Sequence, residues 1–291
     1  MADISAAGGR PLQSSTRARP VLTPGRRQNN WYYMTTPSAL EDFRQHSDQI
    51  TYLVPFWYGV TPSGGLADQS DPGTRRLARE RGVPIIAIIH NYASPQARDL
   101  IHQLLVDPGL RSSLVRAIPV MLNRGHYAGV NIDFEFVPPE DRDEITSFVR
   151  ELDRAISPLG YLVTISVPAQ LRDDPQHPFS GAFDYAELGE VADYLYVLAY
   201  DEHFGTPGPV DSIGFVRRVL DYAVQTVDRP KTILGMAAYG YDWEEDGGMP
   251  VTLIYKQAVS LAEQQGVPIV FDEEAGEPAF TYIRDDVQHI V

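Results

Sequence analysis

Three polar side chains alternate with apolar ones in the segment from Gly129 to Phe136, which reads GVNIDFEF. Successive side chains of a β-strand point to opposite faces, so Asn131, Asp133 and Glu135 would share one face. Burying two carboxylates is costly unless they are paired or used in chemistry. No Lys or Arg in this segment or in the next predicted strand could neutralise them. The pattern favours catalytic carboxylates, and a buried polar network without catalysis is the alternative.

The spacing of the two acids also makes a prediction about their protons. Carboxylates two residues apart on one strand face lie about 6.5 Å apart and repel each other. One of them should therefore hold a proton at neutral pH, as a general acid must. We expect that role at Glu135, because it lies at the carboxyl end of the strand, where α/β barrels place their active sites.

A second segment, Asp193 to His203, reads DYLYVLAYDEH and ends in another group of polar residues. Tyr200 and Asp201 fall at the expected carboxyl end of a strand. In a barrel, the carboxyl ends of all strands lie at the same face. A single Tyr-Asp pair is weak as a signal, but combined with the first segment it indicates one polar site.

The elements that would position these residues alternate along the chain. Apolar strands are predicted at 31–35, 51–57, 85–89, 130–136, 161–167, 194–200 and 232–239. Helical segments are predicted between most of them, including one capped by Ser38, and strand–helix alternation predicts a parallel sheet covered by helices. Seven such units favour an α/β fold of the TIM (β/α)8-barrel type. An open doubly wound sheet is disfavoured because no Gly-rich phosphate loop follows the first strand.

The two ends of the chain differ from this pattern. Residues 1–29 are rich in Gly, Pro, Ser and Arg and predict a disordered leader or linker, leaving 30–291 as the barrel domain. Residues of about 244–291 predict a small α+β insertion after strand 7, with a helix at 251–265 and short strands at 267–271 and 280–283. An eighth strand with its helix needs roughly 30 more residues, so the barrel reads as truncated before strand 8.

Composition excludes several classes of function. The chain has 291 residues, a formal charge of −15 and a pI near 4.8, which disfavours nucleic acid and anionic lipid as partners. It has no Cys, so it has no disulfide, thiolate zinc site or Cys nucleophile. We expect no membrane insertion, because no apolar run approaches 18 residues, and no signal peptide is visible. No cofactor is predicted, and the oligomeric state is left open.

These motifs together resemble glycoside hydrolase family 18, and within it the spore germination branch of spore-cortex-lytic N-acetylglucosaminidases. The family signature Asp-Gly-x-Asp-x-Asp-x-Glu reads AGVNIDFE at residues 128–135, which keeps Asp133 and Glu135 and has Asn131 at one Asp position. The signature Met-x-Tyr-Asp reads LAYD at 198–201. The segments PFWY at 55–58 and YGYDW at 239–243 resemble the same branch, and the similarity runs from about Trp31 to the end.

The resemblance implies a chitinase-like hydrolase acting on peptidoglycan of the spore-cortex type or on chitin-type polymers. It implies substrate-assisted retaining catalysis, in which the substrate's acetamido group replaces an enzyme nucleophile. Glu135 would be the proton donor, Asp133 would stabilise the oxazolinium intermediate, and Tyr200 and Asp201 would bind the acetamido group. The implied location is the spore or cell envelope, or the extracellular space. The candidate substrate-binding residues are Asn131, Trp57, Tyr58, Asn91, His203, Tyr239 and Trp243.

Two alternatives stay open beside this reading. A truncated barrel could be a catalytically impaired, lectin-like sugar-binding relative. A divalent-metal enzyme could use Asp133, Glu135, Asp201 and Asp242, since carboxylates at a barrel mouth can bind Mg²⁺. The metal alternative is disfavoured because neither a phosphate loop nor a basic clamp accompanies these residues.

Overall fold

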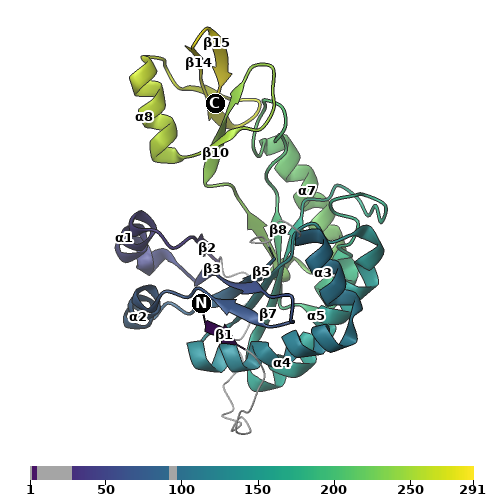
Figure 1. Cartoon of the computed structure of the whole chain (residues 1–291). Helices are drawn as coiled ribbons and strands as arrows, with labels where there is room; N and C mark the ends of the chain where they lie inside the picture. The colour runs from purple at the N-terminus through teal and green to yellow at the C-terminus, as the bar shows by residue number, and fades with distance from the viewer. Residues whose placement is uncertain (1, 5–27, 92–96) are drawn as a thin grey trace. The chain divides into compact units, whose positions relative to one another are not determined.

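The computed structural model describes residues 2–4, 28–91 and 97–291, and the chain forms two compact units (Figure 1). Unit 1 comprises Met1–Pro168, Asp173–Tyr196 and Thr226–Ile233. Unit 2 comprises Ala169–Arg172, Val197–Gln225 and Leu234–Val291.

A nine-stranded sheet, which lies in unit 1 except for the last two residues of β8 and of β9, has the order β1-β4-β3-β5-β6-β7-β8-β9 with β2 paired to β3. Its strands are β1 (Ala2–Ile4), β2 (Asn30–Tyr33), β3 (Tyr52–Val60), β4 (Leu66–Asp68), β5 (Ile86–His90), β6 (Gly129–Asp133), β7 (Leu162–Pro168), β8 (Tyr194–Leu198) and β9 (Thr232–Gly235). The pairs β2–β3, β3–β5, β5–β6 and β6–β7 are parallel, whereas β1 and β4 add an antiparallel ribbon. All seven predicted strands are therefore present in the predicted order.

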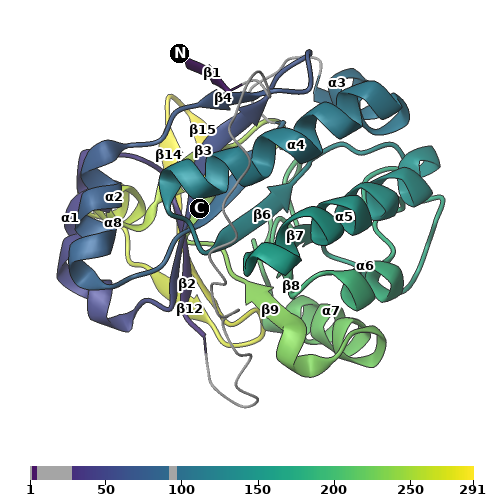
Figure 2. The ribbon, with the colours of Figure 1, turned by 90° about the horizontal axis from the view of Figure 1, so that it is seen from below.

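Six helices of unit 1 follow these strands: α1 (Pro37–His46), α2 (Pro72–Arg81), α3 (Ala97–Val106), α4 (Pro108–Gly125), α5 (Arg142–Ile156) and α6 (Tyr185–Val191). Figure 2 shows α4 and α5 lying across one face of β6 and β7. On that face Phe134 stacks on Phe148 of α5, with ring centroids 5.6 Å apart. Phe134 thus packs under a helix, as the alternation predicts, whereas Phe136 at the end of the segment is exposed.

Local sequence sets where three of these helices begin. Thr36-Pro37, Asp71-Pro72 and Asp107-Pro108 each place a side-chain oxygen at the N-cap and Pro at the first helical position. The cap oxygen accepts a free backbone N–H, and Pro has no N–H to leave unsatisfied. The first helix is accordingly capped by Thr36 and not by Ser38, since Thr36 accepts from the Ala39 N–H at 3.1 Å.

The opposite face of the sheet carries a core of buried residues: Tyr52, Val54, Ile86, Ile88, Leu162, Tyr194 and Tyr196. In the strand register, Ile88 pairs with Asn131, and Asn131 pairs with Thr164. Asn131 therefore lies on this inner face. A parallel sheet curled around an inner core, with helices outside, is a partial TIM barrel, as the sequence predicts.

Unit 2 contains a four-stranded antiparallel sheet in the order β11-β10-β15-β14 and a separate β12–β13 hairpin. Its elements are α7 (Ile213–Thr226, which reaches unit 1 at its last residue), β10 (Tyr239–Glu244), β11 (Val251–Ile254), α8 (Tyr255–Gln265), β12 (Val270–Asp272), β13 (Glu277–Ala279), β14 (Thr281–Arg284) and β15 (Val287–Ile290). Helix α8 packs Ala258, Leu261 and Ala262 against Phe280 and Tyr282.

Two predictions for this region need correction. The strand predicted at 232–239 is two strands, because β9 ends at Gly235 and β10 begins at Tyr239. The helix predicted from residue 251 begins only at Tyr255, because Val251–Ile254 pair with β10. The last two strands, β14 and β15, form a hairpin turning at Asp285 and Asp286. Both have φ above zero, as a two-residue hairpin turn requires.

The predicted leader lies mostly outside the described residues, which omit 5–27. Ala2–Ile4 form β1 and pair with β4. Near the other end of the segment, Asn29 binds Thr51 and the Gln49 carbonyl.

Candidate active site

A network of polar side chains lies on the inner face of unit 1, across β6, β7 and β2. The Asn131 amide donates to Thr164 Oγ1 at 3.0 Å, and Ser166 Oγ donates to Asn131 Oδ1 at 2.8 Å. The Tyr32 hydroxyl lies 2.6 Å from Ser166 Oγ. Asn131 is fully buried and both ends of its amide are hydrogen-bonded to β7, so it links the two strands, and its contact with substrate stays a prediction.

Asp133 is the last residue of β6, and its carboxyl group is buried on this inner face. Burial raises its pKa to about 6, against a smaller lowering by a Ser166 hydrogen bond. The strand register places it opposite His90, whose pKa is lowered by burial. His90 Nδ1 is buried without a hydrogen-bond partner among the described residues.

The sequence predicted that repulsion between Asp133 and Glu135 would raise the pKa of one of them, with the proton expected on Glu135. The structure shows a raised pKa at Asp133, and its cause is burial and not repulsion. Strand β6 ends at Asp133, so Glu135 lies beyond the regular alternation. Loss of solvent around Asp133, and not a second carboxylate, disfavours its charged form.

Glu135 is half-buried and is held by its backbone. The Asn91 side chain accepts from the Glu135 N–H at 2.8 Å and donates to the Glu135 carbonyl at 2.7 Å. The same amide donates to the Ala97 carbonyl at 3.2 Å, at the start of α3. Asn91 is buried and fixes the backbone of Glu135, and its contact with substrate stays a prediction.

Phe136, directly after Glu135, has a φ of 58° and an exposed ring. A bulky residue in the left-handed region carries strain, and such strain persists mainly at functional sites. Asp201 is in the same region with a φ of 57°. Glu135 is therefore next to a residue with left-handed backbone, and Asp201 is itself in that region.

The predicted residues of unit 2 form a second group around Asp201. Its Oδ1 accepts from the Tyr241 hydroxyl at 2.6 Å and from the Tyr239 hydroxyl at 2.8 Å. Tyr200 meets Tyr239 edge to face, with centroids 6.1 Å apart. Burial and the Asp201 carboxylate raise the pKa of Tyr239, so its phenol stays protonated as a donor.

Four predicted substrate-binding side chains are engaged elsewhere. Trp57 is buried and donates to Thr35 Oγ1, and Tyr58 is buried with its hydroxyl 2.9 Å from that of Tyr127. Trp243 is buried and donates to the Phe204 carbonyl. His203 Nδ1 lies 3.0 Å from the Pro209 carbonyl. The two Trp rings and Tyr58 are buried in this structure, and their contact with a sugar stays a prediction.

Sequence reasoning missed Thr164, Ser166, Tyr32 and Tyr241. Thr164 and Ser166 alternate with apolar residues in β7 as Asn131 and Asp133 do in β6, and this was an available signal. Tyr241 lies two residues from Tyr239 on β10, which places both on one face.

Asp242, invoked in the metal alternative, has other partners. Its carboxylate accepts from the Tyr282 hydroxyl at 2.7 Å and lies 2.9 Å from His289 Nδ1. Within residues 2–4, 28–91 and 97–291, no cluster of three or more His, Asp or Glu could hold a metal ion. The four acids named for Mg²⁺ are therefore not gathered as ligands in the described chain.

The family model of glycosyl hydrolases family 18 matches residues 32–290. This chain belongs to that family. It is 33% identical over 264 residues to YdhD of Bacillus subtilis (strain 168), a protein named as a sporulation-specific glycosylase, covering 87% of this chain and 62% of that protein. It is 27% identical to the cortical fragment-lytic enzyme of the same organism, covering 82% and 57%. The chain thus spans about three fifths of these two relatives.

Solved structures agree with this membership. The chitinase of Chromobacterium violaceum ATCC 12472 superimposes with a TM-score of 0.82 at 26% identity, covering 90% of this chain and 84% of that one. The Bacillus cereus spore cortex-lytic enzyme SleL superimposes with a TM-score of 0.83 at 24% identity, covering 90% and 64%, which shows the shared fold. No helix among the described residues is both long and apolar enough to cross a membrane.

Proposed function

We propose that this chain hydrolyses N-acetylglucosamine linkages in peptidoglycan or chitin-type polymers. The observation that carries the proposal is the buried Asp133 at the end of β6, followed by Glu135, whose backbone is fixed by Asn91. An active site needs a carboxyl group held in place near a second one that can stabilise positive charge.

In the proposed reaction Glu135 gives its proton to the glycosidic oxygen, and the bond to the anomeric carbon breaks. The acetamido oxygen of the substrate bonds to that carbon and forms an oxazolinium ion. Asp133, with a pKa of about 6, is mostly ionised at pH 7 and stabilises this cation. Water then opens the ring and returns a proton to Glu135, so the configuration is retained.

Tyr200 and Asp201 are the residues proposed to bind the acetamido group. The two phenols on Asp201 Oδ1 fix the orientation of its carboxylate, which supports a positioning role. By the names of its relatives, we propose a location in the spore or cell envelope, with no cofactor required.

The test is Glu135→Gln, measured by release of reducing ends from chitin oligosaccharides and from peptidoglycan fragments. Loss of the proton donor should lower kcat by about 10²-fold or more. Glu80→Gln, an exposed change on α2, is the matched control and should leave kcat unchanged. Full activity in Glu135→Gln would reject the role. Binding without turnover by the unmutated protein would instead support the sugar-binding alternative.

A further inference from the structure

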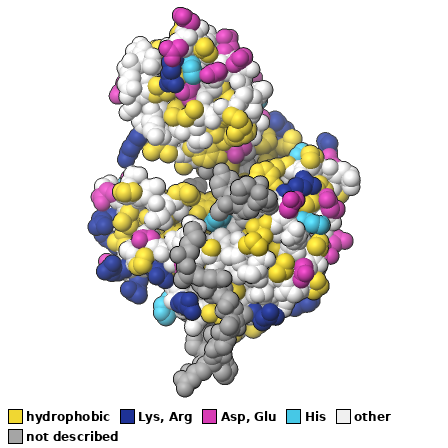
Figure 3. All heavy atoms as spheres, viewed as in Figure 1, with side chains coloured by type: hydrophobic (Ala, Val, Ile, Leu, Met, Phe, Trp, Pro, Cys, Tyr) yellow, Lys and Arg dark blue, Asp and Glu magenta, His cyan; other side chains and the backbone are white. Residues whose placement is uncertain are grey.

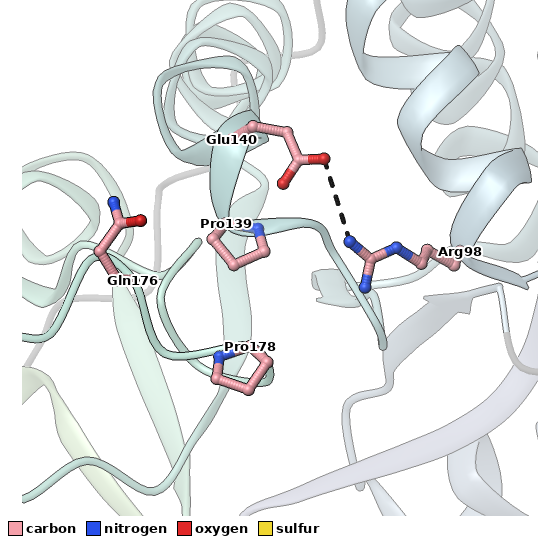
Figure 4. Close-up of a pocket in the computed structure, with 5 residues that line it drawn as sticks. All are labelled: Arg98, Pro139, Glu140, Gln176 and Pro178. Atoms are coloured by element: carbon pink, nitrogen blue, oxygen red, sulfur yellow. Dashed lines mark ion pairs between the residues drawn. The ribbon is translucent and has the colours of Figure 1, made fainter.

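A pocket of about 340 Å³ lies in unit 1, lined by Arg98, Pro139, Glu140, Gln176 and Pro178 (Figure 4). Arg98 is on α3, after β5. Pro139 and Glu140 are in the 3-10 helix Pro139–Asp141, after β6, and the other two precede α6, after β7. Because β5, β6 and β7 are adjacent parallel strands, their following segments meet at the carboxyl edge of the sheet.

Two contacts tie this pocket to the proton donor. Asn91 bonds both the Glu135 backbone and the Ala97 carbonyl, next to Arg98. Phe136 packs edge to face on Phe179, with centroids 6.1 Å apart, and so joins the segment after β6 to the one after β7. Both rings are about half exposed. The pocket therefore lies among the segments that follow β5, β6 and β7, as Glu135 does.

Arg98 and Glu140 place opposite charges at the pocket and form only a weak ion pair with each other. Their closest atoms, Arg98 Nη2 and a Glu140 carboxylate oxygen, are 3.9 Å apart, and the side chains are 53% and 65% exposed. An exposed ion pair of this length stabilises a protein very little, because water competes for both groups. Either charge can therefore change partner at low cost.

We propose that this pocket binds a carboxylate-bearing substituent of the glycan. Arg98 attracts that carboxylate, and the negative charge of Glu140 weakens its binding. A guanidinium binds carboxylate through paired N–H donors, and the Gln176 amide adds a further donor. Chitin is neutral, whereas alternate sugars of peptidoglycan are N-acetylmuramic acid, whose lactyl ether carries either a free carboxylate or an amide-linked peptide that itself bears carboxylates. The pocket thus favours peptidoglycan over chitin, an inference that rests on the proposed function.

The two charges give the proposal a test with opposite signs. In the Glu135→Gln background, which prevents turnover, binding is measured by calorimetry with two tetrasaccharides of equal length. One alternates N-acetylglucosamine with N-acetylmuramic acid bearing free lactyl carboxylates, and the other is chitotetraose. Adding Arg98→Gln should weaken binding of the acidic tetrasaccharide about five- to tenfold, and Glu140→Gln should strengthen it about two- to fivefold. Chitotetraose binding should not change, and Arg98→Lys should restore part of the lost affinity.

Each contrary result has a definite meaning. If the ion pair is only structural, both substitutions remove the same contact and should act in the same direction, which would overturn the proposal. Equal weakening for both ligands by Arg98→Gln would make the pocket a neutral sugar subsite and would also overturn it. Because binding is measured without turnover, an unmutated protein that fails to hydrolyse either polymer would reject the proposed function separately.

Discussion

Asp133 is a carboxyl group in a place that solvent does not reach. Its described neighbours, Ser166 and the neutral His90, offer no positive charge to offset burial. A protein gains no stability from such a group, so the cost is explained best by use in catalysis.

We expect Asp133→Asn to stabilise the fold in a pH-dependent way. The folded pKa of about 6 exceeds the unfolded value near 3.8, so the folded state holds the proton more strongly. Wild-type stability therefore falls as pH rises from 4 through 6, by up to about 3 kcal/mol, and Asn has no such loss. Urea unfolding at pH 4 and 7.5 should show the variant gaining this amount relative to wild type. Asp221→Asn, exposed on α7, should show no gain, and an equal slope in all three proteins would contradict the prediction.

The phenols on Asp201 offer a second test at the residue scale. Tyr241→Phe removes a 2.6 Å hydrogen bond to the carboxylate and keeps the ring in its cluster. Loss of a hydrogen bond to a charged group costs about 1.5–3 kcal/mol, so kcat should fall about tenfold or more with a smaller change in KM. Tyr255→Phe, at a largely exposed ring, should behave as wild type. An unchanged kcat in Tyr241→Phe would show that Asp201 needs no fixed orientation.

Element by element, the site depends on how closely β6 approaches β7 and on the segment after β5. Gly129 is the first residue of β6 and pairs with Leu162 of β7. Asn91 directly follows β5 and hydrogen-bonds to the backbone of Glu135, after β6. The contacts of Gly129 and Asn91 determine the positions of Asp133 and Glu135. Gly129 and Asn91 themselves are not proposed to take part in the reaction.

Gly129→Ala should disrupt β6. A Cβ at this position would lie 2.5 Å from the Leu162 carbonyl oxygen, which is backbone and cannot rotate away. We expect a loss of at least about 2 kcal/mol in the free energy of unfolding. Gly240→Ala in β10 is the matched control, because nothing lies within 4 Å of its added Cβ. Similar denaturation midpoints for the two variants would contradict this account.

Asn91→Ala should affect stability and turnover together. It removes the side-chain partner of the part-buried Glu135 N–H and carbonyl, which costs about 2–4 kcal/mol. A displaced Glu135 should lower kcat more than it changes KM. The exposed Asn123→Ala on α4 should change neither. Loss of stability with full kcat would mean that Asn91 supports the loop but does not position the acid.

Across the whole molecule, the surface charge is strongly negative but unevenly spread. Helix α2 concentrates Arg75, Arg76, Arg79 and Arg81 in ten residues, and Figure 3 shows basic side chains gathered at one edge of the viewed face. The remaining surface carries most of the excess acid of a chain with charge −15.

This charge predicts colloidal behaviour. Repulsion keeps molecules apart at pH 7, and it vanishes near the pI of 4.8. Light scattering of a dilute solution should show self-association rising as pH falls from 7 to 5, and added salt should promote association at pH 7 by screening the repulsion. Constant particle size across this range would contradict the prediction.

The sequence by itself determined the order of the strands and the opposite faces of Asp133 and Phe134, but it placed the first helix cap at Ser38 and began the last helix four residues early. Local rules explain these outcomes. Alternation along a strand sends the side chains of Asp133 and Phe134 to opposite faces of the sheet. A capping residue followed by Pro favours the start of a helix. Only the tertiary structure decided that Asn91 hydrogen-bonds to the backbone of Glu135, 44 residues away. The same holds for the bonds of Asn131 to Thr164 and Ser166 of β7, and for the burial of Trp57 and Trp243. Those outcomes depend on register and burial between distant segments, and no local period encodes how far a side chain will be from water.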